Sequence, residues 1–65
     1  LANAIVEQAA KDYRWARTAL AKDPENGSAA QMRSDTERFF RSAWFGQLTS
    51  LDGEWLLEKL EGEFA

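Results

Sequence analysis

The sequence predicts an all-α fold: a compact three-helix bundle with a short extra helical turn before the last helix, in a single domain over residues 1–65. Apolar residues recur every three or four positions along three long segments, which is the spacing of one face of a helix. Helix-breaking or helix-starting residues at Asp23-Pro24, Ser42 and Asp52 separate these segments. No stretch alternates apolar and polar residues for long enough to predict a strand.

The first helix is expected over residues 3–22, with Asn3 as its N-cap. It ends at Asp23-Pro24, because the residue before a proline is pushed out of the α region. Alanine is abundant here and is the best helix former. Its apolar face is formed by Ile5, Ala9, Tyr13, Ala16 and Leu20, and Val6 and Ala10 widen it.

The second helix is expected to begin at Ser28, which can cap it. On its solvent-exposed face, Glu37 can form ion pairs with Arg33 and Arg41, which lie four residues away on either side. Ser42 interrupts the apolar pattern and predicts a hinge or cap before a short helix that ends at Leu48. The alternative is one continuous helix from Ser28 to Leu48, which Gly46 disfavours without excluding it. The apolar positions are Ala29, Met32, Thr36, Phe39, Phe40 and Ala43.

The last helix is expected to start at Asp52, a good N-cap, with Glu54 in the first turn where the helix dipole favours an anion. Leu56, Leu57, Leu60 and Phe64 mark its apolar face, and Gly62 frays its end. Together these patterns predict one core. Its expected members are Ile5, Ala9, Tyr13, Leu20, Met32, Phe39, Phe40, Trp44, Leu48, Leu56 and Leu60.

A chain of 65 residues buries only about 60% of the surface that its unfolded form exposes, so most of its apolar residues are needed for the core. The sequence has no Cys and no His, which removes disulfides and zinc as stabilising links. The same absence removes the usual general base and the most reactive nucleophile. We therefore expect a protein that is not an enzyme, with no catalytic residues, no metal, no cofactor and no small-molecule substrate.

The formal charge of −3 is unevenly distributed, with a balance of +1 over residues 1–50 and −4 over residues 51–65. A nucleic-acid-binding protein usually has a clear basic excess, which this chain lacks. An arginine-rich edge beside the aromatic residues nevertheless keeps nucleic-acid binding as an alternative, because aromatic stacking next to arginine can hold single strands. That edge is formed by Arg14, Arg17, Arg38 and Arg41.

Two tryptophans lie off the predicted apolar faces and are candidates for contact with a partner. Trp15 is two positions from Tyr13, about 200° around the helix, so the two side chains cannot share a direction. Trp55 lies off the line of Leu56 and Leu60. Each is expected either to cover a flank of the core or to meet another protein, since tryptophan is enriched at interface hot spots.

No apolar run approaches the roughly 20 residues of a membrane span, and no basic segment precedes an apolar one as in a signal peptide. We therefore expect a cytoplasmic protein without membrane contact.

Nearly the whole chain resembles a family of small helical proteins encoded by prophages and integrative elements of Gram-positive bacteria. The distinctive part is Glu37-Arg38-Phe39-Phe40-Arg41-Ser42 followed by Trp44-Phe45. The resemblance also rests on Ala4-Ile5-Val6, Asp12-Tyr13-Arg14, Leu48-Thr49, Asp52-Gly53-Glu54 and the leucine-rich last helix. Two positions depart from the family pattern: Ala43, where an acidic residue is common, and Trp55, where tyrosine is common. The resemblance implies a genomic context and no settled biochemical role.

From these observations we expect a small non-enzymatic accessory protein of a phage-like or mobile element that acts by protein–protein interaction, with a partner protein or with itself. The alternative is nucleic-acid binding through the arginine edge. A third hypothesis is an acidic decoy that occupies a basic surface with the Asp52–Glu63 end.

Overall fold

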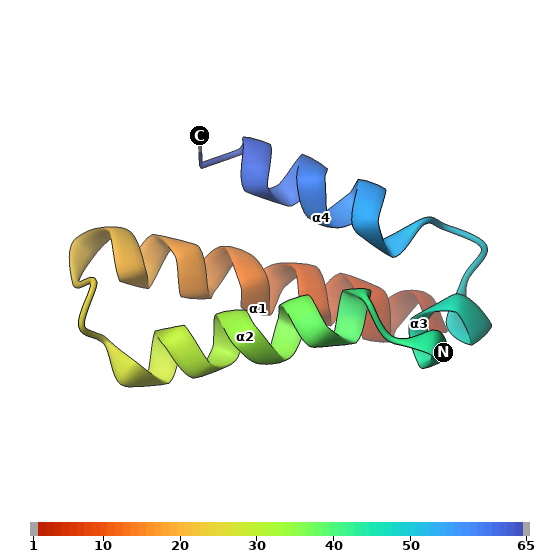
Figure 1. Cartoon of the computed structure of the whole chain (residues 1–65), viewed down its shortest axis with the longest axis horizontal. Helices are drawn as coiled ribbons and strands as arrows, with labels where there is room; N and C mark the ends of the chain where they lie inside the picture. Colours follow the sequence, from red (N-terminus) through yellow and green to blue (C-terminus); the bar gives the residue numbers. More distant parts are fainter. Residues whose placement is uncertain (1, 65) are drawn as a thin grey trace.

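The computed structural model describes residues 2–64 and contains four α-helices and no strand over that range. They are α1 (Ala2–Lys22), α2 (Gly27–Phe40), α3 (Ala43–Leu48) and α4 (Gly53–Gly62) (Figure 1). The prediction of an all-α fold is confirmed. Asn3, the expected N-cap of the first helix, has a side chain that lies outside the described part of the chain.

α1 and α2 form an antiparallel pair that packs closely along its length (Figure 1). The predicted end of the first helix before Asp23-Pro24 is confirmed, because α1 ends at Lys22. The predicted cap of the second helix is wrong. Asn26 takes that role, since its side-chain oxygen accepts the backbone N–H of Ala29 at 3.1 Å and the helix begins one residue before Ser28.

The break after α2 is confirmed at Ser42, so the alternative of one continuous helix to Leu48 is wrong. The Ser42 hydroxyl donates to the carbonyl of Phe39 at 2.7 Å and accepts the N–H of Phe45 at 3.2 Å. It thereby links the end of α2 to the start of α3. The expected cap at Asp52 is also confirmed, because its carboxylate accepts the backbone N–H of Glu54 at 3.0 Å.

The core brings one or two large side chains from each helix together. Tyr13, Phe40, Phe45, Leu57 and Leu60 are almost completely buried and form one cluster. Tyr13, Phe40 and Leu60 were predicted core residues. Ala9, Phe39 and Leu56 were predicted as well, and they are partly buried against the cluster. Leu20, Met32 and Leu48 are also partly buried.

Two core predictions are wrong. Ile5 is 39% exposed and Trp44 is 53% exposed. Because Ser42 starts a new helix, the side-chain directions in α3 do not continue the pattern of α2. Phe45 therefore faces the core, and Trp44 does not. Adjacent helical residues point about 100° apart, so only one of the two can face the core. Ile5 lies in the first part of α1, where the α1–α2 pair has an uncovered side.

Gly53 fixes how α4 approaches the other helices. It is buried at the first position of α4, and a Cβ atom added there would lie 1.8 Å from the carbonyl oxygen of Phe40. Only a residue without a side chain allows the start of α4 to lie this close to the end of α2. α4 contacts both α1 and α2, but much less extensively than these two contact each other. The three-helix bundle therefore stays a prediction beyond the confirmed all-α class.

Candidate interaction surface

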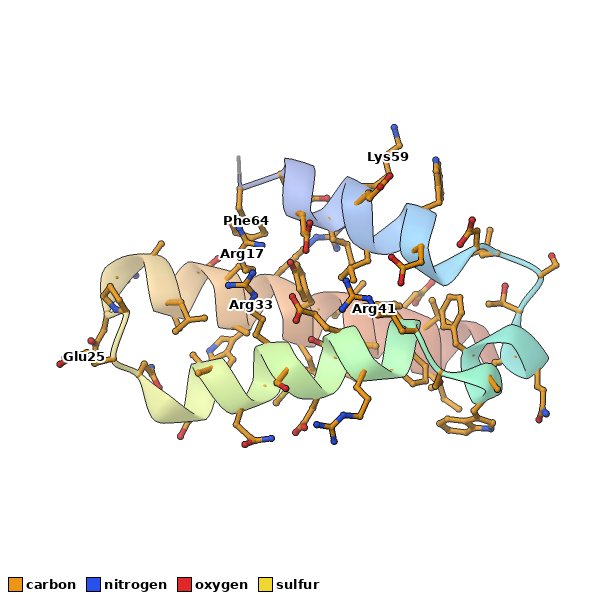
Figure 2. All side chains as sticks on the ribbon, viewed as in Figure 1. Arg17, Glu25, Arg33, Arg41, Lys59 and Phe64 are labelled. Atoms are coloured by element: carbon orange, nitrogen blue, oxygen red, sulfur yellow. The ribbon has the colours of Figure 1, made fainter. Side chains whose placement is uncertain are left out.

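All three tryptophans of the chain have half-exposed side chains, at 51% for Trp15, 53% for Trp44 and 50% for Trp55. None of them belongs to the buried cluster. Trp55 lies on α4, where the Lys59 ammonium sits 5.5 Å from the centre of its ring, and Lys59 points away from α1 and α2 (Figure 2). The chain therefore keeps three of its largest apolar side chains at the surface.

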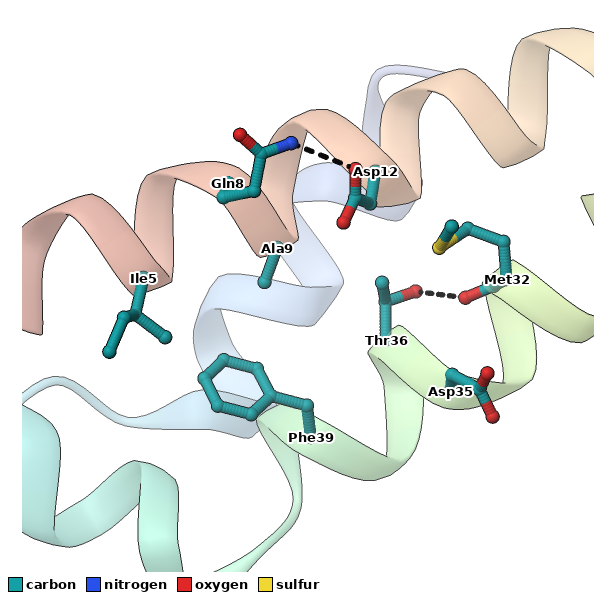
Figure 3. Close-up of a pocket in the computed structure, with 8 residues that line it drawn as sticks. All are labelled: Ile5, Gln8, Ala9, Asp12, Met32, Asp35, Thr36 and Phe39. Atoms are coloured by element: carbon teal, nitrogen blue, oxygen red, sulfur yellow. Dashed lines mark hydrogen bonds between the residues drawn. The ribbon is translucent and has the colours of Figure 1, made fainter.

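An open groove of about 350 Å³ lies between α1 and α2 (Figure 3). α1 lines it with Ile5, Gln8, Ala9 and Asp12, and α2 lines it with Met32, Asp35, Thr36 and Phe39. Both sets have the spacing i, i+3, i+4, i+7, so each is a single helix face two turns long. No α4 residue lines the groove, and Figure 3 shows α4 behind the pair of helices.

The floor of the groove is apolar because its one hydroxyl is turned into the backbone of its own helix. Thr36 is buried, and its hydroxyl donates to the carbonyls of Met32 at 2.9 Å and Arg33 at 3.0 Å. Thr36 and Ala9 both line the groove, from α2 and α1 respectively (Figure 3). Among the described residues, no buried side-chain nitrogen or oxygen lacks a hydrogen-bond partner. The groove therefore offers contact to an apolar group and few polar anchors.

Two tryptophans extend this surface at its ends. Trp44 packs edge-on against Phe39, with ring centres 5.7 Å apart and an interplanar angle of 75°. Trp15 follows Asp12 by three positions on α1, so it is the next residue along the outer edge of the α1 wall. We call this surface, which runs from Trp44 through the groove to Trp15, the groove face. Sequence reasoning missed it because Ile5, Met32 and Trp44 were assigned to a closed core.

The arginine edge predicted from the sequence is divided among separate partners. Arg14 forms a two-pronged ion pair with Glu63, at 2.9 and 3.0 Å. Arg41 pairs with Glu54 at 2.8 Å. Two of the four arginines of this edge are therefore each paired with a carboxylate of α4 or of the residue that follows it.

Arg17 is used within the fold. Its guanidinium donates to the hydroxyl of buried Tyr13 at 2.7 Å and lies 5.2 Å from the centre of the Phe64 ring (Figure 2). Arg38 has no ion pair among the described residues; with Arg41 it lines a polar hollow of about 410 Å³ that also contains the Glu37 side chain. Arg33 pairs with that same carboxylate at 3.1 Å. An anion entering the hollow would therefore meet a carboxylate as well as arginines.

The Arg14–Glu63 ion pair ties the end of α4 to α1 and makes stability depend on pH. The hydrogen bond from Arg14 holds the pKa of the Glu63 carboxyl below its ordinary value; desolvation opposes this shift, and the charge of Arg14 adds to it. Because the pKa of Glu63 is lower in the folded chain than in the unfolded chain, the ion pair stabilises the fold fully at a pH above the pKa of the unfolded chain. This contribution is lost as the pH falls through the pKa of the folded chain.

We expect Glu63→Gln to lower the melting temperature slightly at about pH 7, and we expect this difference to shrink when the pH is lowered to about 3, because protonation of the wild-type carboxyl weakens the ion pair. The effect is small because both side chains are largely exposed. Thermal unfolding followed by circular dichroism at both pH values measures it. Glu58→Gln is the control, since Glu58 is an exposed acid on α4 without an ion pair among residues 2–64. A difference of equal size at both pH values would contradict the assignment.

The described residues contain no group of three or more acidic side chains placed to hold a metal ion. None of their helices is both long enough and apolar enough to cross a membrane. Comparison of the chain with protein-family models, with curated proteins and with solved structures finds no match.

Proposed function

We propose that this chain is a small non-enzymatic helical accessory protein that acts by binding another protein, and that the groove face is its contact surface. The observation that carries the proposal is the groove between α1 and α2, which has an apolar floor and has the half-exposed Trp44 packed against Phe39 at one end. A domain this small needs most of its apolar residues for its own core. Large apolar side chains gathered outside the core are typical of an interaction site.

The genomic setting belongs to the same proposal. The resemblance carried by Glu37-Arg38-Phe39-Phe40-Arg41-Ser42 and Trp44-Phe45 supports a phage-like or mobile element as the source. Within this proposal α1, α2 and α4 act as a three-helix bundle whose role is to hold α1 and α2 at a fixed separation. The lack of His and Cys supports a binding role over a catalytic one. The cytoplasmic location stays a prediction.

Nucleic-acid binding is the weaker alternative. Phosphate contacts require cationic side chains that are available along one surface. Here Arg14 and Arg41 are paired with carboxylates, and Arg17 lies between two aromatic rings. The observations therefore favour protein contact, and direct binding of an oligonucleotide that weakens steeply with added salt is the result that would favour nucleic acid.

Selection of peptides from a displayed library on the immobilised chain tests the proposal. We expect the selected peptides to lose about tenfold or more in affinity for Trp44→Ser, because truncation of an aromatic hot-spot residue typically costs more than 1 kcal/mol. Trp55→Ser is the matched control, since Trp55 is equally exposed but lies on α4. Peptides that lose affinity for Trp55→Ser and not for Trp44→Ser would place the contact elsewhere, and a selection that enriches no peptide would overturn the proposal.

A further inference from the structure

Two aspartates make one end of the groove acidic, whereas the other end is apolar. Asp12 stands on the α1 wall and Asp35 on the α2 wall, whereas Ile5 and Phe39 lie together toward the other end (Figure 3). Each carboxylate accepts one hydrogen bond at 2.9 Å from a glutamine four residues earlier on its own helix, Gln8 and Gln31 respectively. Neither has an ion pair within the part of the chain that the structure describes. Both negative charges therefore remain available beside an apolar floor.

The groove matches a helix better than it matches a small molecule. Its two walls are faces of antiparallel helices and are equal in length, and a third helix can lie along them as α4 lies against both helices on the other side. Helices that bind in such grooves insert side chains at positions i, i+3, i+4 and i+7. A small-molecule site would need several convergent polar groups to orient its ligand, and the Thr36 hydroxyl is already satisfied internally.

We propose that the occupant of the groove is an amphipathic helix of a partner protein, with apolar side chains seated toward Ile5 and Phe39 and with Lys or Arg residues at the Asp12 and Asp35 walls. This inference rests on the proposed function, because it names the partner of the same surface. This inference depends on charge complementarity. Many apolar grooves accept any apolar helix face, but a groove with an aspartate on each wall favours a helix whose apolar face is flanked by cations.

The same charges argue against a second copy of this chain as the occupant. In a twofold dimer a surface faces itself, and the residues that line the groove include Asp12 and Asp35 but no Lys or Arg to meet them. The outer side of α4 is no better a match, since Glu54 and Glu58 are exposed there. The formal charge of −3 on the chain acts in the same direction.

Two synthetic peptides test the inference. Both have leucine at positions i, i+4 and i+7 of a helix of about four turns; one has lysines beside this stripe and the other has glutamates. They are titrated into a chain that keeps Trp44 and carries Trp15→Phe and Trp55→Phe, so that the fluorescence reports on the groove face alone. At low salt we expect the lysine peptide to bind at least about tenfold more tightly, because reversing the charge turns attraction at two walls into repulsion.

The double variant Asp12→Asn with Asp35→Asn should remove most of that preference, whereas Glu58→Gln on α4 should leave it unchanged. Equal binding of the two peptides at the groove face would overturn the basic partner and leave the proposed function standing. Binding of neither peptide would overturn the inference, and the displayed-library selection then decides the proposed function by itself. A dimer seen by light scattering that is abolished by Trp44→Ser would instead make a second copy the occupant and overturn the inference.

Discussion

Gly53→Ala is expected to unfold most of the molecule or to detach α4. A Cβ at this position would lie 1.8 Å from the backbone oxygen and 2.9 Å from the backbone carbon of Phe40, and 3.2 Å from the ring of Phe45. The first two contacts are with backbone, which cannot move aside as a flexible side chain can. Overpacking typically costs about 1–3 kcal/mol, and a contact this short belongs at or above the top of that range.

The cost is large for a chain of this length. Typical stabilities of about 0.05–0.15 kcal/mol per residue correspond to roughly 3–10 kcal/mol here. Thermal unfolding by circular dichroism measures the effect. Gly46→Ala is the matched control, because nothing lies within 4 Å of a Cβ added there and alanine is the better helix former. We expect Gly46→Ala to melt at the same temperature or slightly higher. A Gly53→Ala protein that melts with the wild type would contradict the close approach of α4 to α2.

Phe40→Ala is expected to cost about 3–5 kcal/mol, which is a large part of the roughly 3–10 kcal/mol stability of a domain of this size. Phe40 is 2% exposed, and its ring packs against those of Phe39 and Phe45, with centres 5.5 Å away in both cases. The substitution would leave a cavity where α2, α3 and α4 meet. Denaturant unfolding measures the change in free energy, provided that enough folded protein remains.

The control for this prediction is Trp44→Ala. Trp44 is an aromatic residue of the same segment and was also predicted to be core, but half of its surface is exposed. We expect its loss to cost much less than that of Phe40. If the two substitutions were equally destabilising, the orientation of α3 that separates Trp44 from the core would be wrong.

The sequence predicted the features of this fold that depend on neighbouring residues. Ser42 and Asp52 were identified as helix starts because a cap acts on backbone groups two or three positions away. The periodic faces of α1 and α4 similarly identified Tyr13 and Leu60. The error at Ser28 was local as well, because Asn26 is a residue of the same capping class two positions earlier.

The features that were missed depend on contacts between distant segments. The choice between Trp44 and Phe45 for the core follows from the direction that α3 takes after Ser42, which no periodicity within six residues determines. The role of Gly53 appears only when the carbonyl of Phe40 is placed beside it. The apolar residues of the groove face, such as Ile5, Met32 and Trp44, were assigned to the core because a pattern of apolar positions cannot show that one side of a helix pair remains uncovered.

The most direct test of the central claim is amide chemical-shift mapping on the ¹⁵N-labelled chain during titration with the lysine-flanked helical peptide. We expect the largest changes at residues 5–15 of α1 and 32–39 of α2, together with the Trp44 indole N–H. The Trp55 indole N–H should stay unchanged. Changes confined to α4, or the absence of any change at saturating peptide, would contradict the assignment of the groove face as the surface at which this protein binds its partner.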